Sequence, residues 1–260
     1  MSSIQEKIQT YLEHIADEKH VKIFYACESG SRAWGFPSAD SDYDVRFLYL
    51  RQEEWYLSIN VEKKRDVIET MIESQFDLCG WDLRKALGLL RKSNAALLEW
   101  LASPIVYMEE FTITATMRKL ARQYHSPRAC FWHYLGMAKT NFHKQLTGEY
   151  VKAKQYLYVL RPLLAARWIE NGLGLVPMEF ETLVSRLVDS PELKTEIEKL
   201  IAEKQKGLES DPIPRIAIFH DVIEREFARF EKIVFAAKAP VFPLDELNDL
   251  FRMSLRNVWS

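Results

Sequence analysis

Apolar residues recur at every third or fourth position near the N-terminus, at Ile4, Ile8, Leu12 and Ile15. This spacing places them on one face of a helix, so it predicts an amphipathic helix over residues 3–19. The polar residues between them would face water.

Shorter apolar runs follow and predict strands. Residues 21–27 and 45–50 are rich in β-branched and aromatic side chains, as half-buried strands are. Residues 66–78 hold one or two more strands, which end where Gly80-Trp81-Asp82 breaks the pattern. A short extended piece is expected at residues 105–107.

Helical periodicity returns in residues 82–103, with an interruption at residues 92–94, and it dominates residues 112–260. Within that second region it is broken at Pro127, at residues 172–177 and at residues 211–214. The pattern therefore predicts an α/β N-terminal domain of about 110 residues and a helical C-terminal domain.

The chain has 260 residues, of which 48% are hydrophobic and 28% charged. That composition is typical of a globular protein with an ordinary core, and it excludes a mainly disordered chain. Lys and Arg number 35 against 37 Asp and Glu, which gives a formal net charge of −2. This balance argues against a protein that coats nucleic acid through bulk charge, but it leaves room for a local basic groove.

The cysteines Cys27, Cys79 and Cys130 are far apart and show none of the paired spacings of a disulfide framework or a zinc knuckle. The first twenty residues are polar and charged, unlike a secretory signal. No run of about 18 apolar residues predicts a membrane span. We therefore expect a reduced, cytoplasmic setting and no membrane partner.

A glycine–serine turn, Gly30-Ser31, follows the first expected strand, and Asp42 and Asp44 precede the second. Glycine lets the backbone approach a ligand, and Ser31 with the free amides of a following helix can bind phosphate oxygens. Two acids two positions apart on an extended segment point to the same side of a sheet. Paired carboxylates repel one another and suit Mg²⁺ or Mn²⁺. The segment thus predicts metal-dependent phosphoryl or nucleotidyl transfer.

Other catalytic classes lack their motifs. The six histidines form no HExxH pair, Gly30-Ser31 lacks the G-x-S-x-G frame, and no GxxxxGK[ST] loop is present. A zinc enzyme, a serine hydrolase and a P-loop NTPase are therefore disfavoured.

The segment GSRAWGFPSADSDYDVRF resembles the nucleotidyltransferase superfamily of the DNA polymerase β type, whose signature is a Gly-Ser turn, Asp-x-Asp and a third acid on a later strand. Together with GWDLRKAL, KSNAALLEWL and KQYLYVLRPLLAARW, it is similar to the YcgL-type nucleotidyltransferases of bacteria and phages. The resemblance implies an α+β fold. In it, a small nucleotidyltransferase domain with a mixed sheet and flanking helices, residues 1–110, precedes an all-helical C-terminal domain, residues 111–260.

The resemblance also implies roles for single residues. Gly30 and Ser31 match the nucleotide-phosphate turn, and Asp42 and Asp44 match the carboxylates that hold two metal ions in catalysis. The third metal-binding and catalytic carboxylate is assigned to Asp77.

The alternative to Asp77 is Asp82. Alternation places Asp77 on the face opposite to Phe76 and Leu78, as an acid on a strand at an active site should be. Asp82 directly precedes a helical run, where an N-cap role is natural.

Several further residues have both a phosphate-binding and a structural interpretation. Arg32 can contact phosphate or pair with Asp40 or Asp42, and Arg46 can contact phosphate or balance the charge of the two acids. Lys154, Tyr158 and Arg161 share a helix face that can grip a triphosphate or face water. Trp34 and Phe36 can stack on a base or pack the turn, and Glu28 is expected to form buried hydrogen bonds.

The implied reaction uses an NTP, with ATP as the default, and transfers its nucleoside monophosphate with release of pyrophosphate. The acceptor is a hydroxyl or phosphate on a protein, an RNA end or a small molecule. Two alternatives stay open: an inactive nucleotide sensor, and a protein-modifying transferase of a toxin–antitoxin or phage-defence system.

Overall fold

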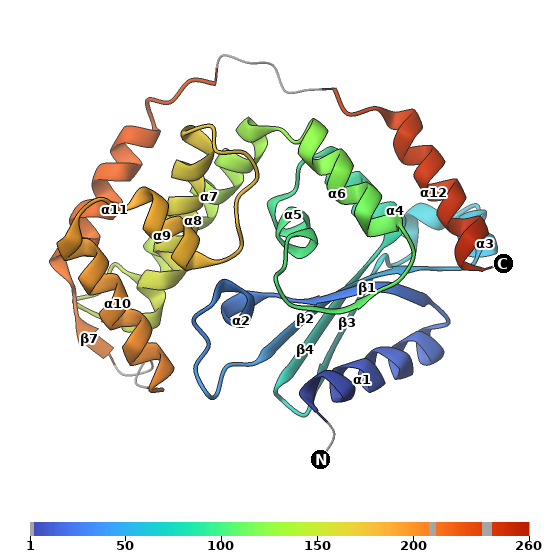
Figure 1. Ribbon diagram of the computed structural model, residues 1–260, viewed down its shortest axis with the longest axis horizontal. Coiled ribbons are helices and arrows are strands. Elements are labelled where there is room, and N and C mark those ends of the chain that lie inside the picture. The colour runs from blue at the N-terminus through green and yellow to red at the C-terminus, as the bar shows by residue number, and fades with distance from the viewer. Residues whose placement is uncertain (1–2, 208–211, 236–240, 260) are drawn as a thin grey trace. The chain divides into compact units, whose positions relative to one another are not determined.

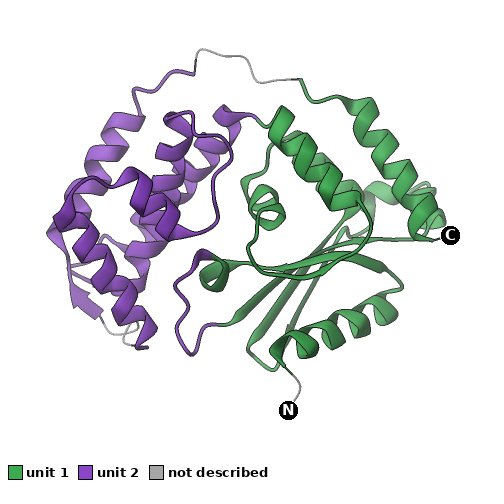
Figure 2. Ribbon diagram, in the orientation of Figure 1, with its two compact units in different colours: residues 1–33, 42–125, 241–260 green, residues 34–41, 126–240 purple. Residues whose placement is uncertain are grey.

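The computed structural model describes residues 3–207, 212–235 and 241–259. The chain divides into two compact units, which Figure 2 colours separately. Unit 1 comprises residues 1–33, 42–125 and 241–260, and unit 2 comprises residues 34–41 and 126–240. These units are discontinuous in sequence and do not divide at residue 110. The assignment of a catalytic domain to 1–110 and a helical domain to 111–260 stays a prediction.

The centre of unit 1 is a five-stranded sheet in the order β3-β4-β2-β1-β5. Its strands are β1 (Lys22–Glu28), β2 (Tyr43–Leu50), β3 (Val67–Ile72), β4 (Phe76–Asp82) and β5 (Val106–Glu109). The pair β2/β4 is parallel, and the other three pairs are antiparallel. The expected mixed sheet with flanking helices is therefore confirmed, and residues 66–78 hold parts of two strands.

The helices of unit 1 lie around this sheet (Figure 1). They are α1 (Ile4–Lys19), α2 (Gly30–Trp34), α3 (Glu53–Tyr56), the 3₁₀ turn η1 (Val61–Lys63), α4 (Leu83–Arg91), α5 (Ala95–Leu101), α6 (Ile113–Tyr124) and α12 (Leu244–Val258). The break expected at residues 92–94 separates α4 from α5. There Ser93 has a φ of 53°, and the Asn94 side chain caps α5 by accepting the Leu97 N–H at 3.0 Å.

The last helix of the chain, α12, belongs to unit 1. The ring of Phe251 in α12 lies edge-to-face against Tyr56, 5.0 Å between centroids. Trp259 donates from Nε1 to the Arg51 carbonyl at 2.9 Å. These contacts join segments about 200 residues apart, which periodicity cannot reveal.

The two faces of the sheet differ in chemistry. Ile8, Leu12 and Ile15 of α1 form one buried cluster with residues of the strands, among them Val45 and Phe47. Because side chains alternate along a strand, Asp44 and Arg46 face away from α1. On β4, Phe76 and Leu78 join the same cluster, so Asp77 also faces away from α1. The polar residues of the candidate site thus share one face of the sheet.

The expected break at Gly80-Trp81-Asp82 is wrong, because β4 continues to Asp82. Gly80 pairs with Phe47 across the parallel ladder, and a Cβ on Gly80 would lie 2.1 Å from Cε2 of that ring. The glycine therefore does not end the strand. It makes room for a buried aromatic side chain of the neighbouring strand.

Unit 2 is mainly helical. Its helices are α7 (Pro127–Gln145), α8 (Ala153–Glu170), α9 (Phe180–Leu187), α10 (Pro191–Gln205) and α11 (Ala217–Phe230). A two-stranded ladder of β6 (Tyr150–Lys152) and β7 (Pro212–Pro214), which the sequence pattern did not indicate, joins them. Helix α8 is buried on most of its circumference. Within the described ranges, no helix is both long and apolar enough to cross a bilayer.

We expect Gly80→Ala to lower the free energy of unfolding by about 1–3 kcal/mol, because the fully buried Phe47 ring cannot move aside without strain. The measurement is urea unfolding. Gly88→Ala is the matched control: Gly88 is an exposed position inside α4 with nothing near its Cβ site. Alanine there should raise stability by about 0.5–1 kcal/mol. Equal effects of the two substitutions would contradict the packing role of Gly80.

Candidate active site

Asp44 and Asp77 lie side by side on neighbouring strands. They are register partners in the parallel pair β2/β4. Arg46 Nη2 is 2.9 Å from Asp44 Oδ1 and 2.8 Å from Asp77 Oδ2. The structure thus brings together three of the residues that sequence reasoning selected. Arg46 balances the charge of Asp44, as one interpretation expected, but its second acidic partner is Asp77 from the neighbouring strand. A phosphate contact by Arg46 stays a prediction.

The electrostatics of Asp44 reflect this crowding. Partial burial raises the pKa of the Asp44 carboxyl, the Arg46 guanidinium lowers that pKa, and the negative charges of Asp77 and Asp42 raise it again. Both neighbouring carboxylates therefore increase the cost of ionising Asp44. A positive charge at this place relieves that cost.

Asp42 lies beside the strand rather than on it. It is exposed and comes one residue before β2 begins, so the period-two argument does not strictly apply to it. Its carbonyl oxygen accepts a hydrogen bond from Arg32 Nε at 3.2 Å, and the Arg32 guanidinium stacks 3.8 Å from the Tyr43 ring centroid. The expected pairing of Arg32 with Asp42 therefore occurs through the backbone, while a phosphate contact by Arg32 stays a prediction.

Gly30 lies directly against the Asp44 carboxylate. A Cβ on Gly30 would be 2.0 Å from Asp44 Oδ2, and the residue has a φ of +57°. Next to it, the Ser29 N–H donates to the Asp44 carbonyl at 2.8 Å. Glycine is thus required here both for its backbone conformation and for close approach. Ser31, the second residue of α2, is buried beside this contact.

Glu28 holds Asp44 from the interior. It is fully buried, one carboxylate oxygen accepts the Asp44 N–H at 2.7 Å, and the other accepts the Tyr107 hydroxyl hydrogen. Burial raises the pKa of Glu28 to about 7, although these hydrogen bonds lower it. The expected buried hydrogen bonding is confirmed. Its partners could not be predicted, because they depend on strand pairing and on β5.

Asp82 has the structural role that its position before a helix suggested. It is 1% exposed, accepts the Arg84 N–H at 2.8 Å as the N-cap of α4, and accepts the Tyr56 hydroxyl hydrogen at 2.6 Å. Of the two candidates for the third carboxylate, Asp77 is the one that shares a guanidinium with Asp44. The catalytic assignment of Asp77 stays a prediction.

Tyr158 and Arg161 of the expected phosphate-binding stripe belong to unit 2, as does Lys154. Arg161 is 1% exposed, donates from Nη2 to the Met178 carbonyl at 3.1 Å, and lies 4.5 Å from the Trp34 ring centroid. The Tyr158 ring meets the same indole edge-to-face at 5.6 Å. These contacts confirm that Tyr158 and Arg161 share a face. The alternative of a solvated face is wrong for the buried Arg161, and the triphosphate role of the three stays a prediction.

Trp34 and Phe36 form part of this packing in unit 2. The Phe36 ring is buried, 5.8 Å from the Trp34 centroid and 5.5 Å from that of Phe180. Their packing interpretation therefore agrees with the structure. Both belong to residues 34–41, the segment between the glycine–serine turn and Asp42.

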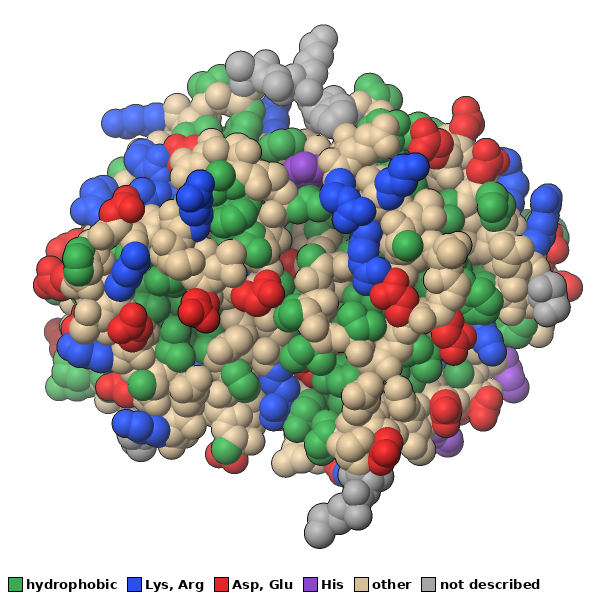
Figure 3. All heavy atoms as spheres, viewed as in Figure 1, with side chains coloured by type: hydrophobic (Ala, Val, Ile, Leu, Met, Phe, Trp, Pro, Cys, Tyr) green, Lys and Arg blue, Asp and Glu red, His purple; other side chains and the backbone are tan. Residues whose placement is uncertain are grey.

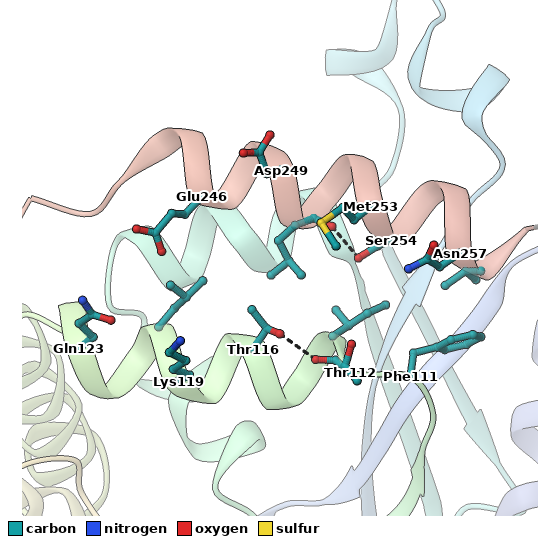
Figure 4. Close-up of a pocket in the computed structure, with 14 residues that line it drawn as sticks. Phe111, Thr112, Thr116, Lys119, Gln123, Glu246, Asp249, Met253, Ser254 and Asn257 are labelled. Carbon is teal, nitrogen blue, oxygen red and sulfur yellow. Dashed lines mark hydrogen bonds between the residues drawn. The ribbon is translucent and has the colours of Figure 1, made fainter.

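The surface adds two observations. Acidic and basic side chains are interspersed over the face drawn in Figure 3, in keeping with the near-neutral charge of the chain. A cavity of about 310 Å³ lies between α6 and α12, with Thr116 and Lys119 on α6 and Glu246 on α12, pointing toward α6, among its lining residues (Figure 4). Its lining contains none of the acids of the candidate site.

Asp44 and Asp77 fit a shared cation, because one oxygen of each lies within 2.9 Å of a single cationic nitrogen. Carboxylate oxygens are also the ligands that Mg²⁺ and Mn²⁺ prefer. Within residues 3–207, 212–235 and 241–259, no three His, Cys, Asp or Glu side chains already form a group that could hold a metal ion. The metal assignment to Asp42, Asp44 and Asp77 therefore stays a prediction.

Comparison with known proteins decides the family. The sequence model of the RNA repair pathway DNA polymerase beta family, RlaP, matches residues 4–253. The chain belongs to the RlaP family. Uncharacterized protein YcgL of Bacillus subtilis (strain 168) is 47% identical over 257 residues, which cover 98% of each chain. The resemblance seen in the sequence motifs is thus confirmed.

A solved structure is also similar: that of a nucleotidyltransferase-like protein from Exiguobacterium sibiricum 255-15. The match has a TM-score of 0.31 and 13% identity, and it covers 97% of this chain and 76% of that chain. A similarity this low carries no statement about function. The RlaP match, in contrast, extends through both compact units. Family membership indicates a nucleotidyltransferase of the polymerase β type.

Asp82 gives a testable pH dependence. Burial raises the pKa of Asp82 to about 6, so the stability that this group contributes is full below about pH 4 and is lost as the pH rises through about 6. Asp82→Asn keeps an acceptor oxygen but cannot ionise. As the pH rises from about 4 to 7, the wild type should lose this stability and Asp82→Asn should not. The difference in free energy of unfolding, variant minus wild type, should therefore increase by about 1–3 kcal/mol over this range.

Urea unfolding at several pH values measures this difference. Asp82→Ala removes both acceptor oxygens and should destabilise the protein at every pH. A difference between Asp82→Asn and wild type that stays constant with pH would show that Asp82 does not ionise in this range.

Proposed function

We propose that this protein is a metal-dependent nucleotidyltransferase that transfers a nucleoside monophosphate from an NTP, with ATP as the default donor, to a hydroxyl or phosphate acceptor and releases pyrophosphate. The observation that carries the proposal is the convergence of Gly30, Asp44 and Asp77 at one place on the sheet. Membership of the RlaP family supports it.

Asp42, Asp44 and Asp77 would hold Mg²⁺ or Mn²⁺. A bound divalent ion supplies positive charge for the phosphate oxygens and lowers the pKa of an attacking hydroxyl. The protein contributes a rigid frame for the acids: Glu28 and Ser29 fix the backbone of Asp44 on both sides, and the β2/β4 ladder fixes Asp77. Such fixed positions favour catalysis because little reorganisation is needed in the transition state.

Gly30, Ser31 and Arg32 would contact the phosphates of the NTP. They occupy the turn and first residues of α2, directly beside Asp44. We also propose a phosphate-binding role for Lys154, Tyr158 and Arg161 of α8. Arg161 is 1% exposed and donates to the Met178 carbonyl, so its guanidinium would have to leave this partner to reach a phosphate.

The family description names an RNA repair pathway, so we place an RNA end first among the acceptors. The net charge of −2 favours recognition of a terminus over binding along a long nucleic acid. A protein or a small molecule would be the other acceptors. The proposed metal-dependent chemistry of the site is the same for all three classes of acceptor.

The test is incubation with labelled NTPs, Mg²⁺ and a set of acceptors: RNAs ending in a hydroxyl or a phosphate, and a cell extract. Wild type is compared with Asp42→Ala/Asp44→Ala. Label transferred by the wild type alone supports the proposal and identifies the acceptor class. Nucleotide binding without transfer or pyrophosphate release would instead favour an inactive sensor.

Asp44→Asn should lower metal-dependent turnover at least about 100-fold, because it removes one charge from the metal-binding group. Stability should change little, since the amide keeps an oxygen for Arg46. Asp77→Asn should behave similarly and Asp82→Asn should retain turnover. Full activity in Asp44→Asn, or loss in Asp82→Asn with retention in Asp77→Asn, would contradict these assignments.

Gly30→Ala should also abolish turnover, because its Cβ would displace the Asp44 carboxylate. Gly35→Ala provides a matched control: Gly35 also has a positive φ, +92°, but nothing lies within 4 Å of its Cβ site. Both variants carry backbone strain of about 1 kcal/mol or more. Only Gly30→Ala should lose transfer activity in the labelled-NTP assay. Loss in both would mean that strain alone, and not contact with Asp44, explains the effect.

A further inference from the structure

Arg46 occupies the place between the two carboxylates that a cation would take. Its Nη2 donates to one oxygen each of Asp44 and Asp77, at 2.9 and 2.8 Å. Its Nη1 donates to the Asp77 carbonyl at 2.9 Å, which anchors the guanidinium to the neighbouring strand. The Arg46 side chain is only 16% exposed. The charge of the two acids is therefore partly balanced by a cation that the protein itself carries.

A divalent ion that bridged the two acids through Asp44 Oδ1 and Asp77 Oδ2 would lie beside the guanidinium that already binds these oxygens. Mg²⁺ needs its oxygen ligands at about 2.0–2.1 Å in near-octahedral order. A guanidinium already hydrogen-bonded to those oxygens would block that approach and repel the ion. Metal binding through these two oxygens therefore competes with Arg46, and it becomes stronger when Arg46 leaves at least one of the acids.

A displaced guanidinium then needs another anion. A nucleotide triphosphate offers oxygens that match the guanidinium fork, and Arg46 lies on the same face as Asp44. Binding of the nucleotide would thus remove the competitor of the metal. By linkage, the metal would strengthen nucleotide binding by the same factor.

We propose that Arg46 is a built-in counterion that competes with the divalent metal for Asp44 and Asp77, and that NTP phosphates release this competition by pairing with Arg46. This inference rests on the proposed function. It assigns to Arg46 a positioning role that holds the acids in place without metal and couples metal binding to nucleotide binding.

The test measures Mn²⁺ and Mg²⁺ binding by calorimetry, with no turnover involved, for wild type, Arg46→Met, Arg46→Gln and Asp44→Asn. Without nucleotide, Arg46→Met and Arg46→Gln should bind metal about tenfold or more tightly than wild type. A non-hydrolysable NTP analogue should tighten metal binding by wild type more than by either Arg46 variant. If Arg46→Met fails to fold, Arg46→Gln still allows the test, because its amide can donate to the Asp77 carbonyl.

Arg65→Met is the matched control, because Arg65 also pairs with an acid of the sheet, Glu69, but is exposed. Its metal affinity should equal that of wild type. If metal binding is unchanged or weaker in both Arg46 variants and is lost in Asp44→Asn, the proposed competition by Arg46 is wrong. The proposed metal-dependent function would still stand. Absence of metal binding by every variant, with and without nucleotide, would overturn the proposed metal-dependent function as well.

Discussion

The parallel pairing of β2 with β4 is the constraint on which the candidate site depends. It sets Asp44 directly beside Asp77, although 32 positions separate them along the chain. Backbone hydrogen bonds fix this register, and a slip of either strand by one residue would turn its acid to the face covered by α1. The buried cluster of α1 with Val45, Phe47 and Leu78 makes such a slip costly, since it would expose the cluster and bury charge.

The acids are held at short distance against their mutual repulsion. Glu28 accepts the Asp44 amide, Gly30 leaves room for the Asp44 carboxylate, and Arg46 supplies the positive charge. Glu28 thus fixes the backbone position of Asp44, Gly30 gives its carboxylate space, and Arg46 balances its charge. Membership of the RlaP family gives this arrangement its functional context as a nucleotidyltransferase of the polymerase β type.

The segment that connects the two site motifs belongs to the helical unit. Residues 34–41 join the glycine–serine turn to Asp42, and they pack in unit 2 through Trp34 and Phe36. Tyr158 and Arg161 contact Trp34 in that unit. The segment between the two site motifs therefore belongs to the packing of the helical unit, which a division of the chain at residue 110 would not suggest.

Local pattern alone determined much of this protein. The periodicity of Ile8, Leu12 and Ile15, the helix break at Ser93 and the alternation that turns Asp77 away from Phe76 all depend on neighbours in sequence, so they could be predicted. The N-cap role of Asp82 follows from the same local rules.

Tertiary structure decided the rest, because it depends on partners far away in the chain. Gly80 interrupts a hydrophobic pattern but continues a strand, since the Phe47 ring fills its place. The contacts of Glu28 with Tyr107, the return of α12 to unit 1 and the burial of Arg161 likewise join distant segments. Sequence spacing could select the acids, but only the strand register could place Arg46 between them.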